Sequence, residues 1–255
     1  MRESIKDYIN KEVIQIIENT DRSIVDRMVK LNGYLDLLIP RGSASFIEYV
    51  RKNATVPIIE TGAGNNHIYV NNDADLDMAT RIIINAKVQR PAVCNAARKV
   101  LIHKDIAEKY LPKLISELKK YGVIIKGDQK VVKIIQDVVL ATEEDWDKEY
   151  MDLTLAIKIV DSVQEAVEHI NKHGTKHSEA IITNSLKDAQ YFTQNVDAAC
   201  TYVNASIRFT DGEQFGFGAE VGISTQKLHA RGPMGIKELT TTKYVIFGEG
   251  QTREI

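Results

Sequence analysis

Runs of Val, Ile and Leu alternate along this chain with longer segments whose apolar positions recur at helical spacing. In the first part, residues 13–17, 36–39 and 56–59 predict strands, and residues 21–31 and 44–52 predict helices. Continuous apolar strands separated by amphipathic helices are typical of a parallel sheet covered on both faces.

The same alternation resumes after Cys94 and continues to residue 203. Strands are expected at 99–103, 123–125, 138–140, 155–160, 180–183 and 201–203. Helices are expected at 106–121, 162–173 and 186–196. The rhythm predicts an α/β protein of two units that meet between residues 85 and 94.

Glycines gather after the third expected strand, at Gly62 and Gly64, and again between residues 212 and 222. Glycine permits close approach of the backbone to a ligand, so both clusters are candidate borders of a site. Neither GxGxxG nor GxxxxGK[ST] occurs. Only three expected strands precede Gly62, whereas a dinucleotide-binding sheet normally has five or six, so the first unit is expected to be part of such a domain.

Composition excludes several classes of protein. The 255 residues carry a net charge of −2, with 44% hydrophobic and 27% charged residues, so no basic nucleic-acid surface is expected. No apolar run reaches the roughly 18 residues of a membrane span, and the N-terminus has no signal-peptide pattern. Cys94 and Cys200 show no CxxC spacing, so we expect no disulfide framework, no metal site and a reducing cytoplasm.

Cys94 stands in the segment QRPAVCNAA, residues 89–97. If Asn95 begins a short helix, its N-terminal amides would stabilise a thiolate or a developing oxyanion, and Arg90 would add positive potential. The alternative is a buried structural cysteine, since free cysteine is commonly buried. The local sequence leaves both interpretations open.

Other candidates are weaker when taken singly. Glu60 ends an apolar run, at the edge where α/β proteins place ligands, but a solvated strand end explains it as well. Arg208 and Arg231 carry a charge that suits an anionic substrate, and surface loops explain them equally. Cys200 lies in an apolar run, which favours a place in the core.

Longer segments carry a more specific signal. They are PRGSASFIEYV (40–50), VPIIETGAGNNHIYV (56–70), the stretch 75–96 that ends in QRPAVCNA, 141–162, HSEAIIT (177–183), and 202–244 with its LHARGPMG motif. Together these segments resemble the gamma-glutamyl phosphate reductases of the aldehyde dehydrogenase superfamily, over nearly the whole chain.

The resemblance implies roles for particular residues. Cys94 matches the catalytic cysteine, Glu60 matches the glutamate found 34 positions upstream, and Glu149 matches the glutamate that holds the nicotinamide ribose. Gly42 and Ser43 match the helix start that borders the NADP(H) cofactor, although PRGSAS departs there from the usual PRGGKG-like turn.

The implied reaction is NADPH-dependent reduction of L-glutamyl 5-phosphate to L-glutamate 5-semialdehyde with release of phosphate, a step of proline biosynthesis. Cys94 would form a thioester, and Glu60 would line the site, because water activation would waste that thioester. Gly62 is a further residue expected to bind the cofactor. The candidates for binding the substrate are Arg208, Arg231 and Asn95.

The resemblance also implies a domain division and partners. Residues 1–88 would be a truncated Rossmann-like cofactor domain, 89–236 the parallel-sheet catalytic domain, and 237–255 a tail with an oligomerisation strand at 243–247. The match covers the C-terminal three-fifths of the family. One hypothesis is therefore a reductase whose N-terminal part lies on a complementing chain or outside this sequence, with a homo-oligomer as a further expectation. The other is a truncated, non-catalytic paralogue that acts as a folded interaction module.

Overall fold

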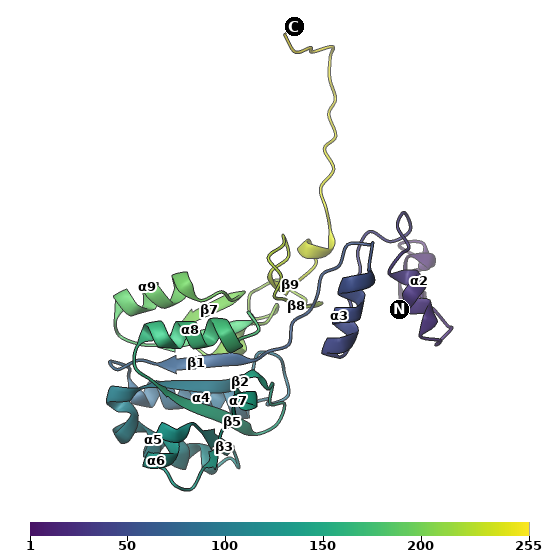
Figure 1. The fold of residues 1–255 in the computed structure, drawn as a ribbon. Coiled ribbons are helices and arrows are strands. Elements are labelled where there is room, and N and C mark those ends of the chain that lie inside the picture. The colour runs from purple at the N-terminus through teal and green to yellow at the C-terminus, as the bar shows by residue number, and fades with distance from the viewer. Residues whose placement is uncertain (255) are drawn as a thin grey trace. The chain divides into compact units, whose positions relative to one another are not determined.

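The computed structural model describes residues 1–254, apart from the side chain of Ala44. The chain forms two compact units, Met1–Ile59 and Glu60–Ile255 (Figure 1). This division lies well before the expected boundary at residues 85–94, because β1 (Asn66–Val70) and α4 (Leu76–Val88) belong to the second unit and its sheet.

The first unit contains little regular structure. Its elements are α1 (Arg2–Ile5), a 3-10 turn (Lys11–Val13), α2 (Ser23–Met28) and α3 (Ala44–Asn53). The helix expected at 44–52 is confirmed, and the one expected at 21–31 is shorter. At the start of α3 the Ser43 side chain accepts a hydrogen bond from the amide of Phe46, which caps the helix.

The prediction of three strands in this unit is wrong. Ile16 is 79% exposed and lies in irregular backbone, and the other two runs meet only at one parallel bridge, between Leu38 and Ile58. A strand needs hydrogen-bonding neighbours along its length, and apolar character alone does not provide them.

The second unit is built on a seven-stranded parallel sheet in the order β4-β3-β5-β2-β1-β6-β7. Besides β1, its strands are β2 (Ala97–His103), β3 (Ile124–Gly127), β4 (Val139–Leu140), β5 (Thr154–Val160), β6 (Ser178–Ile182) and β7 (Cys200–Val203). The six strands expected from the sequence are confirmed. β1 was missed, because Asn66 and His67 give its first half a polar character.

Helices cover both faces of the sheet (Figure 1). On one face lie α4, α5 (Lys104–Lys119) and α6 (Gln129–Ile134), and on the other α8 (Val163–His173) and α9 (Leu186–Asn195). Alternate residues of one strand serve the two cores: Ile68 and Val70 pack in the first, and Tyr69 in the second.

Shorter elements complete the second unit. They are α7 (Glu143–Asp147), 3-10 turns at Ile207–Phe209 and Lys237–Leu239, and the antiparallel pair β8 (Gly222–Ser224) and β9 (Gly232–Met234). The strand expected at 243–247 is not formed; this segment has no pairing partner among the described residues, and Ile246 and Phe247 are 88% and 93% exposed. No helix within residues 1–254 combines the length and apolar character that crossing a membrane requires.

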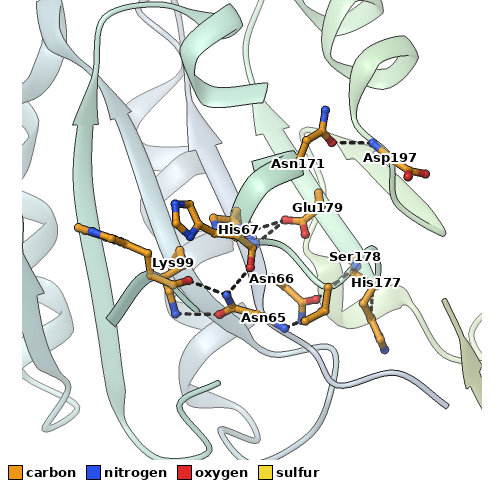
Figure 2. Close-up of polar contacts among 12 residues, drawn as sticks. Asn65, Asn66, His67, Lys99, Asn171, His177, Ser178, Glu179 and Asp197 are labelled. Atoms are coloured by element: carbon orange, nitrogen blue, oxygen red, sulfur yellow. Dashed lines mark hydrogen bonds and ion pairs between the residues drawn. The ribbon is translucent and has the colours of Figure 1, made fainter. Parts of the chain in front are cut away.

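A polar cluster lies inside the sheet where β1 and β6 begin (Figure 2). Glu179 accepts a hydrogen bond from the His67 amide at 2.5 Å and contacts His67 Nδ1 at 3.1 Å. Burial is the main cause that raises the pKa of Glu179 and lowers that of His67. The ring of His169 lies 5.5 Å from that of His67, and burial, followed by the charge of Lys158, lowers its pKa to about 3.

We predict that the buried histidines make the fold sensitive to acid. A histidine whose pKa is lowered on folding contributes stability above its unfolded pKa of 6.5 and loses it as the pH falls toward the folded value. For His169 the loss between pH 7.5 and pH 5 is about 2 kcal/mol. Urea unfolding of His169→Phe should therefore show a pH dependence smaller by about this amount.

The exposed His229 supplies the control. His229→Gln should unfold with the pH dependence of the parent chain. If His169→Phe does so as well, burial of this imidazole does not govern the acid sensitivity.

Candidate active site

Cys94 lies in a turn that enters β2, three residues before the strand begins. The helix expected from Asn95 onward is wrong: residues 94–96 continue the turn, in which the Ala96 amide donates to the Val93 carbonyl at 3.1 Å. The chain does not form a helix here because Ala97 already pairs with Asn66 of β1 in the parallel sheet. The thiol therefore does not lie at the start of a helix formed by its own segment.

The Cys94 turn is at the amino ends of the parallel strands. Asn66 begins β1 and Ser178 begins β6 at the same edge. Ligands of open α/β sheets usually bind at the opposite, carboxyl edge. A general rule about sheet edges therefore does not locate this site from the sequence.

The pKa of the thiol is raised in both cysteines, and burial is the main cause in each. Burial raises the pKa of the Cys94 thiol, and the carboxylates of Glu220 and Glu149 raise it further. Its own amide and the charge of Arg98 lower this pKa, so the leading cation is Arg98, whereas the sequence pointed to Arg90. Burial also raises the pKa of Cys200.

Gly64 lies directly against the Cys94 turn, and Glu149 is bound to Gly64. A Cβ on Gly64 would be 1.5 Å from the Cys94 carbonyl oxygen, so only glycine permits this approach. The Gly64 amide donates to Glu149 Oε1 at 2.8 Å, and Arg98 Nη2 lies 3.6 Å from the same oxygen. The structure thus brings Glu149 and Cys94, 55 positions apart in the sequence, to one place.

Glu60 begins the segment that leads to Gly64. Its carboxylate accepts from Gln226 Nε2 at 3.1 Å, and its amide donates to Gln226 Oε1 at 2.7 Å. Gly62 follows, and a Cβ there would be 2.4 Å from Thr225 Cγ2, so close packing explains this glycine without a ligand. Glu60 was expected at a strand end of the main sheet, and this prediction is wrong. The segment is held instead by β8 and the loop that follows it.

Asn95 and Arg208 lie on the side of the turn toward the 3-10 turn Ile207–Phe209. Asn95 Nδ2 donates to the carbonyls of Arg208 at 3.3 Å and Thr210 at 2.8 Å, while its buried Oδ1 has no partner among the described residues. Arg208 Nε donates to Gln89 Oε1 at 3.0 Å. Asn95 therefore holds the loop that carries Arg208.

Arg208 lines a polar hollow with Gln89 and Asp211. Burial, followed by the charge of Arg90, lowers the pKa of Arg208, and the charges of Cys94 and Asp211 raise it. The guanidinium is therefore within electrostatic reach of the thiol.

Arg231 has a different setting. Its Nη2 donates to Asp197 Oδ1 at 2.8 Å, and Lys176 and Lys227 lie 3.3 and 2.9 Å from Asp197 Oδ2. Three cations thus share one carboxylate, and Arg231 is already paired.

Gly42 and Ser43 belong to the first unit. They border a hollow at the N-terminus of α3, together with Arg22, Arg41 and Tyr49. Two arginines and the amides of a helix N-terminus suit an anionic phosphate group. Within residues 1–254, no group of three His, Cys, Asp or Glu side chains is arranged to hold a metal ion.

Comparison with known proteins identifies relatives along the whole chain. The gamma-glutamyl phosphate reductase of Dictyoglomus thermophilum is 60% identical over 255 residues, covering 100% of this chain and 61% of that relative. The corresponding protein of Clostridium botulinum is 62% identical over 240 residues, covering 94% of this chain and 58% of that relative. The chain thus spans about three fifths of the length of the curated relatives that it matches.

Solved structures agree with this likeness. The crystal structure of gamma-glutamyl phosphate reductase from Thermotoga maritima matches with a TM-score of 0.95 at 55% identity, over 99% of this chain and 61% of that one. An acetylating aldehyde dehydrogenase from Geobacillus thermoglucosidasius has a TM-score of 0.73 at 19% identity, over 99% and 65%, which shows a shared fold. A sequence profile of the aldehyde dehydrogenase family matches residues 3–134, more than half of the chain. By fold and by sequence, the chain belongs to the aldehyde dehydrogenase family.

Proposed function

We propose that this chain carries the nucleophile of an NADP(H)-dependent gamma-glutamyl phosphate reductase, which makes L-glutamate 5-semialdehyde for proline biosynthesis. One observation supports the proposal: Gly64 packs against the Cys94 carbonyl and donates its amide to Glu149, so the proposed nucleophile and the proposed ribose ligand share one neighbour. Identity of about 60% to relatives with this name supports the substrate class.

In the proposed reaction, the Cys94 thiolate attacks the acyl carbon of L-glutamyl 5-phosphate. The bond between that carbon and the phosphate oxygen breaks, inorganic phosphate leaves, and a thioester on Cys94 remains. After reduction of the thioester, the C–S bond breaks, which releases the semialdehyde and restores the thiolate. Glu60, whose carboxylate is held by Gln226, lines the site and does not activate water, since hydrolysis would discard the acyl group.

NADP(H) is the proposed cofactor, and when bound it supplies the hydride that reduces the thioester. The hollow at α3 is the proposed place for the phosphate groups of such a molecule. Gly42, Ser43, Arg22 and Arg41 border it, together with Asp26, whose carboxylate accepts from the Tyr49 hydroxyl. Glu149 would accept hydrogen bonds from the ribose through its carboxylate. Gly62 contributes by letting the chain pack against Thr225, which directs the backbone toward Gly64.

Arg208 is the proposed partner of an anionic group of the substrate, the phosphate or the α-carboxylate. It borders the polar hollow, and the structure gives its Nη atoms no acceptor among the described residues. Asn95 supports it by binding its carbonyl. Arg231 is a weaker partner because Asp197 already pairs with it.

The domain roles remain part of the proposal. Residues 1–88 would contribute to cofactor binding, 89–236 would carry the chemistry, and the exposed strip 243–247 would join a second copy or a complementing N-terminal chain. The alternative is a non-catalytic interaction module. The apolar exposure of Ile246 and Phe247 suits an association surface in either case, so activity has to decide between the two.

The first test measures phosphate-dependent reduction of NADP by glutamate 5-semialdehyde, with the chain alone and with a separately expressed N-terminal portion of a close relative. We expect activity in the presence of the second portion and a loss of at least about 10³-fold in Cys94→Ala, because the proposed thioester forms on this residue. Cys200→Ala is the matched control and should retain activity. Lack of activity in both preparations would favour the interaction module.

The second test concerns Arg208. Arg208→Gln should raise KM for the semialdehyde or phosphate and lower kcat/KM by about 10–100-fold, the usual effect of losing one charge-assisted hydrogen bond. Arg231→Gln removes a charge that is paired with Asp197, so it should lower the unfolding midpoint and leave KM near the parent value. Equal KM values in both variants would remove Arg208 from the substrate site.

A further inference from the structure

The carbonyl groups of the Cys94 turn are held from the inside of the molecule. Two side chains, Asn66 and Arg98, hydrogen-bond four of them, and both side chains are fully buried. Neither residue was singled out as a functional candidate from the sequence. Arg98 lies four positions after Cys94 within β2, and Asn66 begins β1.

Asn66 holds the second half of the turn. Its Nδ2 donates to the Cys94 carbonyl at 2.6 Å and to the Ala96 carbonyl at 2.9 Å. Its Oδ1 accepts from the Ser178 amide of β6 at 3.3 Å, so both ends of the side-chain amide are used (Figure 2). Through Asn66 of β1, the Cys94 carbonyl is therefore linked to the start of β6, the strand on the far side of β1.

Arg98 holds the first half. Its Nη1 donates to the Pro91 carbonyl at 3.0 Å, and its Nη2 donates to the Val93 carbonyl at 2.8 Å. The same Nη2 lies 3.6 Å from Glu149 Oε1, so one guanidinium joins the turn to the carboxylate expected to bind ribose. The planar fork of arginine is suited to holding several oxygens in one arrangement.

These contacts determine where the amides of the turn point. In a trans peptide the C=O and the following N–H point in opposite directions. Because Arg98 binds the Val93 carbonyl and Asn66 binds the Cys94 carbonyl, the amides of Cys94 and Asn95 face away from these buried side chains. Among the described residues, neither amide donates to a carbonyl or side chain of another residue. The Asn95 amide is therefore available, and the Cys94 amide is shared only with its own thiol.

We propose that Arg98 and Asn66 are positioning residues that orient the Cys94 and Asn95 amides toward the oxyanion that forms on the acyl carbon. Arg98 also fixes the turn relative to Glu149. The inference rests on the proposed function, since the oxyanion belongs to that reaction. Donors that are already oriented need no reorganisation when the charge develops, which is how such amides accelerate acyl transfer.

A purely structural role explains the arginine less well. Burying a guanidinium is costly unless its N–H groups find acceptors, and Arg98 Nε has none among the described residues. An apolar side chain of similar volume would fill the space without that cost. The specific advantage of arginine here is that it holds the Pro91 and Val93 carbonyls and reaches Glu149.

The experiment uses this chain and measures the iodoacetamide reaction of Cys94 between pH 6 and pH 10, with Cys200 as the internal reference. In the parent chain we expect Cys94 to react faster than Cys200. In Arg98→Met, the Cys94 midpoint should rise by about one pH unit, because a nearby positive charge is lost, and the rate at pH 7.5 should fall about tenfold. In Arg98→Lys the charge remains, so the midpoint should stay close to that of the parent.

The two positioning effects separate in the complemented reductase assay. Arg98→Lys and Asn66→Ala should both lower kcat by about 10–10³-fold with little change in KM, as expected when an oriented amide donor is lost. Asn66→Ala should leave the Cys94 midpoint unchanged, because an amide side chain carries no charge.

Lys87→Met is the matched control, since Lys87 is also fully buried and cationic, and it contacts the Tyr150 carbonyl instead of the turn. It should leave the Cys94 midpoint and kcat near the parent values. The inference is overturned if Arg98→Met and Lys87→Met behave alike, or if Cys200 changes as much as Cys94. If the parent Cys94 reacts no faster than Cys200 and supports no reduction, the proposed function fails instead.

Discussion

The close contact between Gly64 and the Cys94 carbonyl is the constraint on which the site depends. It requires a residue without a Cβ, and it brings the segment that begins at Glu60 against the turn that enters β2. The parallel pairing of β1 with β2 begins two to three residues further along the two segments, at Asn66 and Ala97. The thiol, Glu149 and the 60–64 segment are therefore located by one backbone approach.

Charge is distributed around that contact in an unusual way for a protein interior. Lys87, Arg98 and Lys99 are all buried beneath the amino ends of the strands. Burial, and then the charge of Arg98, lowers the pKa of Lys87 and of Lys99 to about 7. Arg98 thus disfavours the charged forms of two neighbouring lysines. It also lowers the pKa of the Cys94 thiol, although by less than Glu149 raises it.

Local sequence predicted most of the second unit because its signals agree with the packing. The run Thr154–Val160 is apolar on both faces, and helices cover both faces, so a strand was correctly expected. The helix at Val163–His173 begins after Ser162, whose side chain caps it. In contrast, residues 13–17 have a strand-like composition but no neighbouring strand, and Asn66–Val70 is a central strand whose first residues are polar.

By itself, the sequence determined the alternation of strands and helices, the parallel sheet and the identity of Cys94 as the candidate nucleophile, since residue type, periodicity and long matching segments are properties of the chain. Only the tertiary structure showed that the Cys94 turn is not a helix start and that Asn66 and Arg98 hold its carbonyls. It also showed that Arg231 is paired with Asp197. These contacts join residues of different elements, and no repeating pattern in the sequence indicates which residues will meet. They depend on the order of the strands in the sheet and on the path of the loops.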